Sequence, residues 1–264
     1  MRGRVVVEVD ALTRVGRVVL VTGGGRGLGK GLVEAFAEAG DHVVACGRNQ
    51  PSAGTLAASF FPCDVRDPEQ VRSLVSAVVA DHGRVDVLIN NAGGTPYAPA
   101  ATMSPRLFEK VVALNLLGPF YVAQRVNEVM QAQDDGGVII NIGSTVSMRP
   151  SKDVSAYVAA KAGLVGLTRG LALEWAPKVR VNLVSPGLLR TELLEETYGQ
   201  NPGAVEKTVP MRRFATAQDV AAACLLLSSP GVSYVTGAEL VVDGGGEEPA
   251  WLGAVVRDAG GEEL

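Results

Sequence analysis

The feature that most constrains this chain is a glycine-rich turn that joins an apolar run to an amphipathic stretch. Residues 18–21 are apolar and rich in β-branched side chains, which is typical of a buried parallel strand. Residues 22–29 read TGGGRGLG, and an amphipathic stretch then runs to Gly40. Glycines let the backbone turn tightly and let a pyrophosphate approach a helix N-terminus, where free N–H groups favour anions. The turn alone also fits an ordinary strand-to-helix connection, but strand, turn and helix together predict a dinucleotide-binding unit.

Apolar strands and amphipathic helices alternate along the rest of this chain of 264 residues. The alternation predicts a parallel sheet with helices on both faces, which is a single-domain, doubly wound α/β fold of the Rossmann type. We expect strands near residues 18–22, 42–46, 60–63, 86–90, 138–142, 180–185 and 239–242, and helices near 27–39, 68–81, 104–132, 156–176 and 216–228. The predicted domain spans 15–246, with an N-terminal extension at 1–14, a substrate lid at about 188–213 and a C-terminal tail at 247–264.

Composition excludes several classes of function. The net charge of −4 gives no reason to expect nucleic acid or an anionic membrane as a partner. Apolar runs are too short for a membrane span, and Glu8 and Asp10 interrupt the stretch that a signal peptide would need, so we expect a cytoplasmic protein. Cys46, Cys63 and Cys224 lie in apolar runs and are interpreted as buried hydrophobic residues, with no disulfide and no metal site. With two histidines in the chain, a Ser-His-Asp triad is hard to build.

Tyr157 and Lys161 lie four residues apart in a segment predicted to be helical, so they share one helix face. A free tyrosine, with a pKa of about 10, is a poor general acid or base near neutral pH. A cation held close favours the phenolate, and we therefore expect Lys161 to lower the pKa of Tyr157. An isolated pair of this kind is usually an ordinary surface pair, so its interpretation depends on the rest of the chain.

Further short motifs follow the predicted strands in order. They are Asp64-Val65 after the third strand, Asn90-Asn91-Ala92-Gly93 after the fourth, Asn115 in the long helix, Ser144 thirteen residues before Tyr157, Asn182 to Pro186-Gly187 with Thr191, and Val242-Asp243-Gly244-Gly245. Together with the spacing Thr22-Gly23-x-x-x-Gly27-x-Gly29 and the pair Tyr157 and Lys161, they resemble the short-chain dehydrogenase/reductase family through most of the chain.

The resemblance implies an NAD(P)(H)-dependent oxidoreductase that interconverts a secondary alcohol and a ketone by hydride transfer. Tyr157 would be the general acid/base, and Lys161 would lower its pKa and hold the nicotinamide ribose. Ser144 would hydrogen-bond the reacting oxygen, although it could also cap the strand end, with Thr145 and Ser147 as rival hydroxyls. Asn115 would anchor a water that connects Lys161 to solvent.

The resemblance also assigns a cofactor-binding set and no metal. The set is Thr22, Gly23, Arg26, Gly27, Leu28, Gly29, Arg48, Asp64, Val65, Asn91, Ala92, Gly93, Tyr157, Lys161, Pro186, Gly187, Leu189 and Thr191. Thr191 also fits a helix N-cap.

The end of the second strand bears on the choice between the two nicotinamide cofactors. Gly47 stands where NAD-preferring relatives carry aspartate, and Arg48 and Arg26 could bracket the phosphate of NADP. We therefore favour NADP(H) over NAD(H), although Arg48 could also be solvated or stack on adenine. The connection from Arg48 to Phe60 is short, which suggests a more open adenosine end.

Substrate and assembly are less constrained. The expected pocket walls, residues 94–97, Val146, Met148 and 188–213, are largely apolar and favour a hydrophobic alcohol or ketone such as a steroid, 3-oxoacyl or polyketide compound. Arg190, Arg212 and Arg213 keep carrier- or CoA-linked substrates open, but we favour their interpretation as solvated surface charges.

The resemblance implies a homotetramer or homodimer through the helices at 104–132 and 156–176. Trp251 in the tail could anchor it on a neighbouring subunit or pack on its own core. The alternative function is a catalytically silent NADP-binding regulator or scaffold on the same fold. Such a protein would be expected to lose Tyr157 or Lys161, and this chain retains both.

Overall fold

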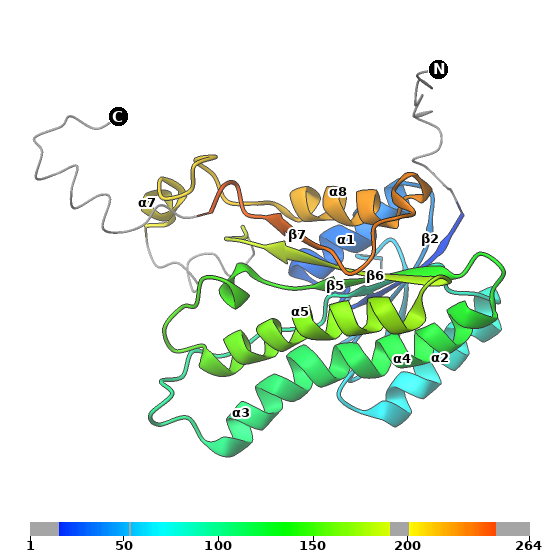
Figure 1. Ribbon diagram of the computed structural model, residues 1–264, viewed down its shortest axis with the longest axis horizontal. Coiled ribbons are helices and arrows are strands. Elements are labelled where there is room, and N and C mark those ends of the chain that lie inside the picture. The colour runs from blue at the N-terminus through cyan, green and yellow to red at the C-terminus, as the bar shows by residue number, and fades with distance from the viewer. Residues whose placement is uncertain (1–15, 53, 191–200, 247–264) are drawn as a thin grey trace, which may run out of the picture.

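A parallel sheet of seven strands forms the centre of the computed structural model, which describes residues 16–52, 54–190 and 201–246 (Figure 1). The strand order is β3-β2-β1-β4-β5-β6-β7. The strands are β1 (Val18–Thr22), β2 (His42–Gly47), β3 (Ser59–Pro62), β4 (Val87–Asn90), β5 (Gly137–Ile142), β6 (Val179–Pro186) and β7 (Glu239–Val242). The doubly wound α/β fold expected from the sequence is confirmed.

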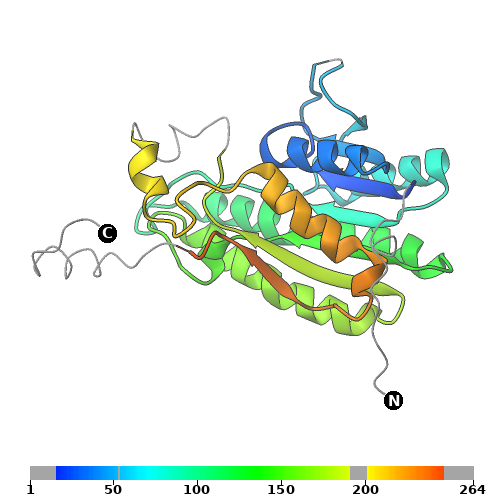
Figure 2. The same ribbon diagram turned by 90° about the horizontal axis from the view of Figure 1, so that it is seen from above.

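Helices cover both faces of this sheet (Figures 1 and 2). One face carries α1 (Gly27–Glu38) and α8 (Ala217–Ser228), and the other carries α2 (Pro68–His82), α4 (Gly118–Ala132) and α5 (Ser155–Trp175). The remaining helical elements are α3 (Pro105–Val112), the π-helical turn η2 (Ala113–Leu117), η3 (Thr145–Ser147), α7 (Pro202–Glu206) and η4 (Pro230–Val232).

The central strands are mainly apolar because they supply two cores. Val19 and Val21 of β1 pack with α1 and α8, whereas Leu20 between them packs with α2, α4 and α5. Successive side chains of a strand point to opposite faces, so a strand covered on both sides needs a continuous apolar run. The buried cysteines Cys46, Cys63 and Cys224 belong to these cores, as predicted.

The strand order places a switch point beside β1. The chain leaves β1 towards β2 and β3 and then returns to place β4 on the other side of β1. In such sheets a crevice opens beyond the carboxyl ends of the strands at the reversal, and ligands bind there. Because every strand pair is parallel, all the strand-end motifs meet at this one edge.

The predicted element ends differ from the observed ones by at most one residue, with one larger difference inside a helix. The helix expected at 104–132 is divided into α3 and α4 by the π-helical turn η2, which contains Asn115. Between β2 and β3 the described residues form only turns and bends, in agreement with the short connection noted in the sequence. Within the described ranges, no helix is long and apolar enough to cross a membrane.

Some predictions fall on residues outside the described ranges. They concern the N-terminal extension at 1–14, Thr191 and the middle of the predicted lid, and the tail with Trp251.

Gly31 sets the approach of α1 to α8, and its replacement should destabilise the fold. A Cβ at Gly31 would lie 2.3 Å from the Cβ of Ala217, so the two helices would have to separate. We expect Gly31→Ala to lower the free energy of unfolding by about 1–3 kcal/mol in chemical denaturation. Gly166→Ala on α5 is the control, because a Cβ there meets nothing within 4 Å. It should raise stability by about 0.5–1 kcal/mol. Equal effects of the two substitutions would contradict the close packing of α1 on α8.

Candidate active site

The glycine turn after β1 is shaped by contacts that exclude side chains. Gly23 and Gly27 have positive φ values of 66° and 52°, which other residues rarely adopt. A Cβ at Gly29 would lie 2.1 Å from the carbonyl oxygen of Gly23. Glycine at these positions therefore lets the chain enter α1 and leaves the free N–H groups of its first turn open to a phosphate. The turn fits the pyrophosphate of a dinucleotide.

Thr22 joins the glycine turn to the segment after β4. Its Oγ1 accepts hydrogen bonds from the backbone N–H groups of Asn91 and Ala92, both at 3.0 Å. In return, the Asn91 side chain donates to the carbonyl oxygens of Thr22 at 2.9 Å and Gly23 at 3.2 Å. These reciprocal bonds fix two of the predicted cofactor segments against each other.

The residues predicted to hold the adenosine of the cofactor lie where β2 and β3 end. The N–H of Gly24 donates to the carbonyl oxygen of Cys46 at 3.1 Å, so the glycine turn lies beside Gly47 and Arg48. Arg26, at the start of α1, and Arg48 are both exposed. A Cβ at Gly47 would meet the Phe60 ring at 3.4 Å, which is an ordinary contact, so a side chain could be accommodated there.

Asp64 has a partner that the sequence did not suggest. Arg66 forms an ion pair with it at 2.5 Å, and this hydrogen bond is the main reason that the pKa of Asp64 lies below its usual range. The charge of Arg48 lowers it further. The predicted adenine contact of Asp64 would therefore compete with Arg66. Val65 beside it is buried and approaches Gly118 closely.

Ser144, Tyr157 and Lys161 meet where β5 ends and α5 begins. The Lys161 side chain is 3% exposed, its Nζ donates to the carbonyl oxygen of Ile142 at 2.7 Å, and Nζ lies 5.5 Å from the centroid of the Tyr157 ring. The hydroxyl of Ser144 lies close enough to Tyr157 to lower the pKa of its phenol. Ser144 also accepts from the N–H of Val146 at 3.4 Å, so it caps η3 as well as contacting Tyr157.

The rival hydroxyls are used elsewhere. Ser147 donates to the backbone carbonyl of Ser144 at 2.8 Å, and Thr145 is buried at the start of η3. Ser144 is therefore the hydroxyl that the structure places against Tyr157.

The expected lowering of the pKa of Tyr157 by Lys161 is not what the structure gives. Burial raises the pKa of Tyr157, and the hydrogen bond from Ser144 only partly opposes this. Burial also lowers the pKa of Lys161 to about 8, because a charged amine loses its hydration there. Desolvation of both groups outweighs the effect inferred from their spacing, so Tyr157 keeps its proton at neutral pH.

Asn115 is fully buried, and it holds the loop after β4. Its Oδ1 accepts from the N–H of Gly94, and its Nδ2 donates to the carbonyl oxygens of Gly94 and Val111, all at 2.9 Å. A Cβ at Gly93 would lie 2.8 Å from Asn115 Oδ1 and 3.5 Å from Lys161 Nζ, so Gly93 lies between these two side chains. The role of Asn115 as a water anchor stays a prediction.

The remaining predicted residues lie at the end of β6. Pro186 is buried, the N–H of Gly187 donates to the carbonyl oxygen of Val242 at 3.0 Å, and Leu189 forms a β-bridge with Ala215. Apart from Thr191, the structure therefore brings the predicted catalytic and cofactor-binding residues to one sheet edge. In the described part of the chain, no cluster of histidine, cysteine or acidic side chains could hold a metal.

A buried chain of polar side chains behind the site was missed by the sequence reasoning. Asn90 Nδ2 donates to Asn141 Oδ1 at 3.0 Å, and Asn141 Nδ2 donates to Thr168 Oγ1 at 2.9 Å. Asn90 also donates to the carbonyl oxygen of Pro119 at 3.0 Å. The chain links β4, β5, α4 and α5. The polar residue inside the apolar run 138–142 was the available signal for it.

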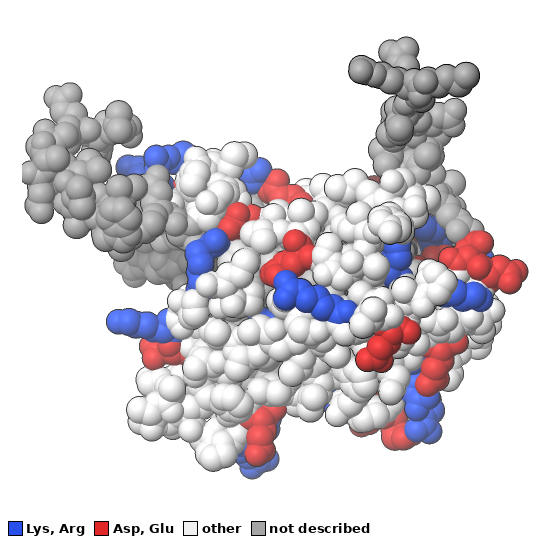
Figure 3. Space-filling model, viewed as in Figure 1, with Lys and Arg blue, Asp and Glu red and all other residues white. Residues whose placement is uncertain are grey.

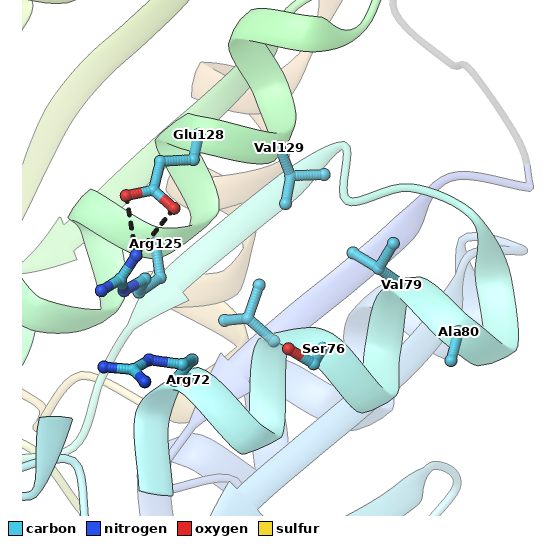
Figure 4. A pocket seen from close by; sticks show the side chains of 8 residues that line it. Arg72, Ser76, Val79, Ala80, Arg125, Glu128 and Val129 are labelled. Carbon is cyan, nitrogen blue, oxygen red and sulfur yellow. Dashed lines mark hydrogen bonds and ion pairs between the residues drawn. The ribbon is translucent and has the colours of Figure 1, made fainter. Parts of the chain in front are cut away.

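A groove between α2 and α4 lies apart from these residues (Figure 4). It is lined by Arg72, Val75, Ser76, Val79, Ala80, Arg125, Glu128 and Val129. Arg125 pairs with Glu128 of its own helix, and Arg72 pairs with Glu69 of its own helix. No predicted catalytic or cofactor residue lines this groove.

Comparisons with known proteins bear on the family to which the chain belongs. The family model described as enoyl-(acyl carrier protein) reductase matches residues 23–247. D-threitol dehydrogenase of Mycolicibacterium smegmatis is 37% identical over 241 residues, covering 87% of this chain and 92% of the relative. The peroxisomal 2,4-dienoyl-CoA reductase of Mus musculus is also 37% identical, covering 87% and 83%. The aldohexose dehydrogenase of Thermoplasma acidophilum, solved in a ligand-free form, superposes with a TM-score of 0.83 at 32% identity, covering 88% and 94%.

The chain therefore belongs to the short-chain dehydrogenase/reductase family of NAD(P)-dependent oxidoreductases, as its motifs predicted.

The burial of Lys161 predicts a specific pH dependence of stability. Its pKa falls from 10.5 to about 8 on folding, so between these values the unfolded state binds more protons than the folded state. Loss of the Lys161 proton should therefore make the free energy of unfolding rise with pH between about 8 and 10.5. Below about pH 8 the buried amine is charged, and its full desolvation penalty is present. Denaturant unfolding from about pH 8 to pH 10 should show wild type gaining stability relative to Lys161→Met. Lys152→Met, at an exposed position, should run parallel to wild type. If Lys161→Met also runs parallel, the amine is not desolvated.

Proposed function

We propose that this protein interconverts a secondary alcohol and a ketone with Tyr157 as the general acid/base. The observation that carries this proposal is the meeting of Ser144, Tyr157 and Lys161 at the sheet edge that also holds the glycine turn. The nicotinamide, when bound, would supply or accept the hydride. The protein supplies position and the proton.

In the reducing direction, Tyr157 donates its phenolic proton to the substrate oxygen. Its raised pKa keeps that proton on Tyr157 at neutral pH, so the proton is present for transfer, but the phenol is a weaker acid than one with a pKa near the working pH. Ser144 hydrogen-bonds the same oxygen and stabilises the negative charge that develops there. Lys161 lies beneath the Tyr157 ring and would hold the nicotinamide ribose from there. Alcohol oxidation needs the phenolate and should become faster as pH rises.

For the substrate we propose a hydrophobic secondary alcohol or ketone of steroid, 3-oxoacyl or polyketide type. Tyr97 is 66% exposed and Met148 46% exposed beside the site, and both offer apolar contact area. Arg190 and Arg213 are engaged within the protein, by Glu206 and Asp219, which supports their interpretation as surface charges. Arg212 donates to the carbonyl oxygen of Lys207. The similar D-threitol and aldohexose dehydrogenases and the dienoyl-CoA reductase make polyols, aldoses and acyl thioesters the comparison substrates.

We further propose a cytoplasmic homotetramer or homodimer that binds neither nucleic acid nor membrane. Phe108 of α3 and Leu173 of α5 are 42% and 84% exposed, and Leu117 of η2 is 39% exposed. The face of the molecule over these helices carries few charged side chains (Figure 3). Burying this apolar surface between subunits would be favourable.

Tyr157→Phe should lower turnover by about 10²–10⁴-fold, because it removes the transferable proton and little else. Turnover would be measured by nicotinamide absorbance with apolar ketones, 3-oxoacyl thioesters and keto sugars. Cofactor affinity would be measured by fluorescence titration. The affinity should change little. Tyr121→Phe on α4 is the matched control and should keep its activity, since Tyr121 packs on the core. Substantial turnover by Tyr157→Phe would overturn the assignment of Tyr157 as general acid. A wild-type protein that binds cofactor but reduces none of these compounds would favour the catalytically silent regulator.

For the cofactor we propose NADP(H), with NAD(H) as the alternative. Arg48→Ala should lower the preference for NADPH over NADH by about 10–100-fold, because a charge-assisted contact to the ribose phosphate is lost. Gly47→Asp should shift the preference further towards NADH by placing a carboxylate at the ribose. Arg72→Ala, an exposed arginine of α2, is the control. An unchanged preference in Arg48→Ala would show that Arg48 does not contact the phosphate.

A further inference from the structure

Asp243, directly after β7, is held by two hydrogen bonds in a turn that packs against Gly187. Its Oδ2 accepts from Arg149 Nη2 at 2.5 Å, and its Oδ1 accepts from the N–H of Gly245 at 3.1 Å. The Asp243 side chain is 12% exposed and that of Arg149 is 43% exposed. A charge-assisted bond to a shielded carboxylate is stronger than a pair of fully exposed charges.

The turn that contains Asp243 also touches two segments that border the proposed substrate site. A Cβ at Gly187 would lie 2.7 Å from the Cβ of Asp243, so the backbone after Pro186 passes close to this side chain. The carbonyl oxygen of Gly244 accepts from the N–H of Met211 at 3.1 Å. The turn therefore packs against the segment around Gly187 and hydrogen-bonds the segment around Met211.

Arg149 ends the loop that begins with Ser144. The N–H of Arg149 donates to the carbonyl oxygen of Thr145 at 2.8 Å, so the loop is short and closed on itself. It carries Val146 and Met148, which we expect to face the substrate. Its far end is tied to the turn after β7 by the ion pair with Asp243, across 94 residues of sequence.

We propose that the ion pair between Arg149 and Asp243 is a positioning device that sets the width of the substrate site. It fixes the loop after Ser144 against the turn that supports Gly187 and Met211. Arg149 and Asp243 are thus specificity-determining residues without contacting the reacting atoms. The proposal rests on the proposed reductase function, and it names the pair of side chains that decides which ketones are accepted.

The test is a double-mutant cycle in which the measured quantity is the ratio of the kcat/KM values for two substrates. Arg149→Met, Asp243→Asn, the double variant and the charge-swapped Arg149→Asp/Asp243→Arg would be assayed with a small and a bulky apolar ketone. We expect each single variant to change the ratio of the two kcat/KM values by about fivefold to tenfold, since small displacements of a reacting group have large kinetic effects. The double variant should be no worse than either single one, and the charge swap should restore most of the ratio.

The matched control is Arg213→Met. Arg213 forms a comparable pair with Asp219 at 2.6 Å, with 47% and 29% of the two side chains exposed, at the start of α8. Its loss should lower the melting temperature without changing the substrate ratio. If the Arg149 pair is purely structural, Arg149→Met should likewise lower the melting temperature without changing the substrate ratio, and that result would overturn the proposal. Additive effects of the two single variants on the substrate ratio would also overturn it.

A second measurement separates this proposal from the reductase assignment. Arg149→Met should speed hydrogen exchange at the N–H of Met211 by about tenfold, because the turn that accepts its hydrogen bond is released, whereas Arg213→Met should leave it unchanged. If wild type reduces no carbonyl compound, the proposed function fails and this exchange rate still decides whether the pair holds the turn. Unchanged exchange in Arg149→Met would refute the positioning role.

Discussion

The site depends on one buried hydrogen bond, from Lys161 Nζ to the carbonyl oxygen of Ile142. It holds the N-terminal half of α5 against the end of β5, and with it Tyr157 one turn earlier. Behind it, Thr168 and Asn141 hold the same helix and strand together two turns further on. A buried amine is unfavourable unless it is partnered, so the backbone oxygen both orients the lysine and offsets part of its desolvation. The position of the phenol is thus set by backbone and buried polar groups rather than by surface contacts.

Departures from ordinary structural rules gather around this bond. Asn115 lies in a π-helical turn, an element that is frequent at functional sites. Asn90 Oδ1 is buried without a hydrogen-bond partner, and among the described residues it is the only such side-chain atom. Lys161 is buried as a cationic residue with a lowered pKa. Lys161 lies on α5 with Tyr157, Asn90 ends β4 and bonds Asn141 of β5, and Asn115 lies in η2 beside α5. Such local conflicts are expected where function rather than folding determines the residue.

Much of this could be predicted from the sequence, because the signals were local. Apolar runs bounded by turns located the strands to within one residue, and the spacing from Ser144 to Lys161 identified residues that do meet. Features that depend on distant contacts could not be predicted. Asn115 of the π-helical turn bonds Gly94, 21 residues away in the sequence, and the pKa of Tyr157 depends on burial that spacing does not reveal. Arg149 and Asp243 are brought together only by the parallel order of β5, β6 and β7.

The two ends of the crevice are built differently, and this difference has a physical consequence. At the adenosine end, Arg26 and Arg48 are exposed and Asp64 is held by the partly exposed Arg66, so side chains there can exchange partners at little cost. At the nicotinamide end, Lys161, Asn115 and Pro186 are buried and fixed by backbone contacts. A cofactor can therefore rearrange the first end on binding but must fit the second as it stands. Under the proposed function, discrimination between cofactors would belong to the adaptable end and the geometry of proton transfer to the rigid one, so changes in cofactor preference need not disturb the chemistry.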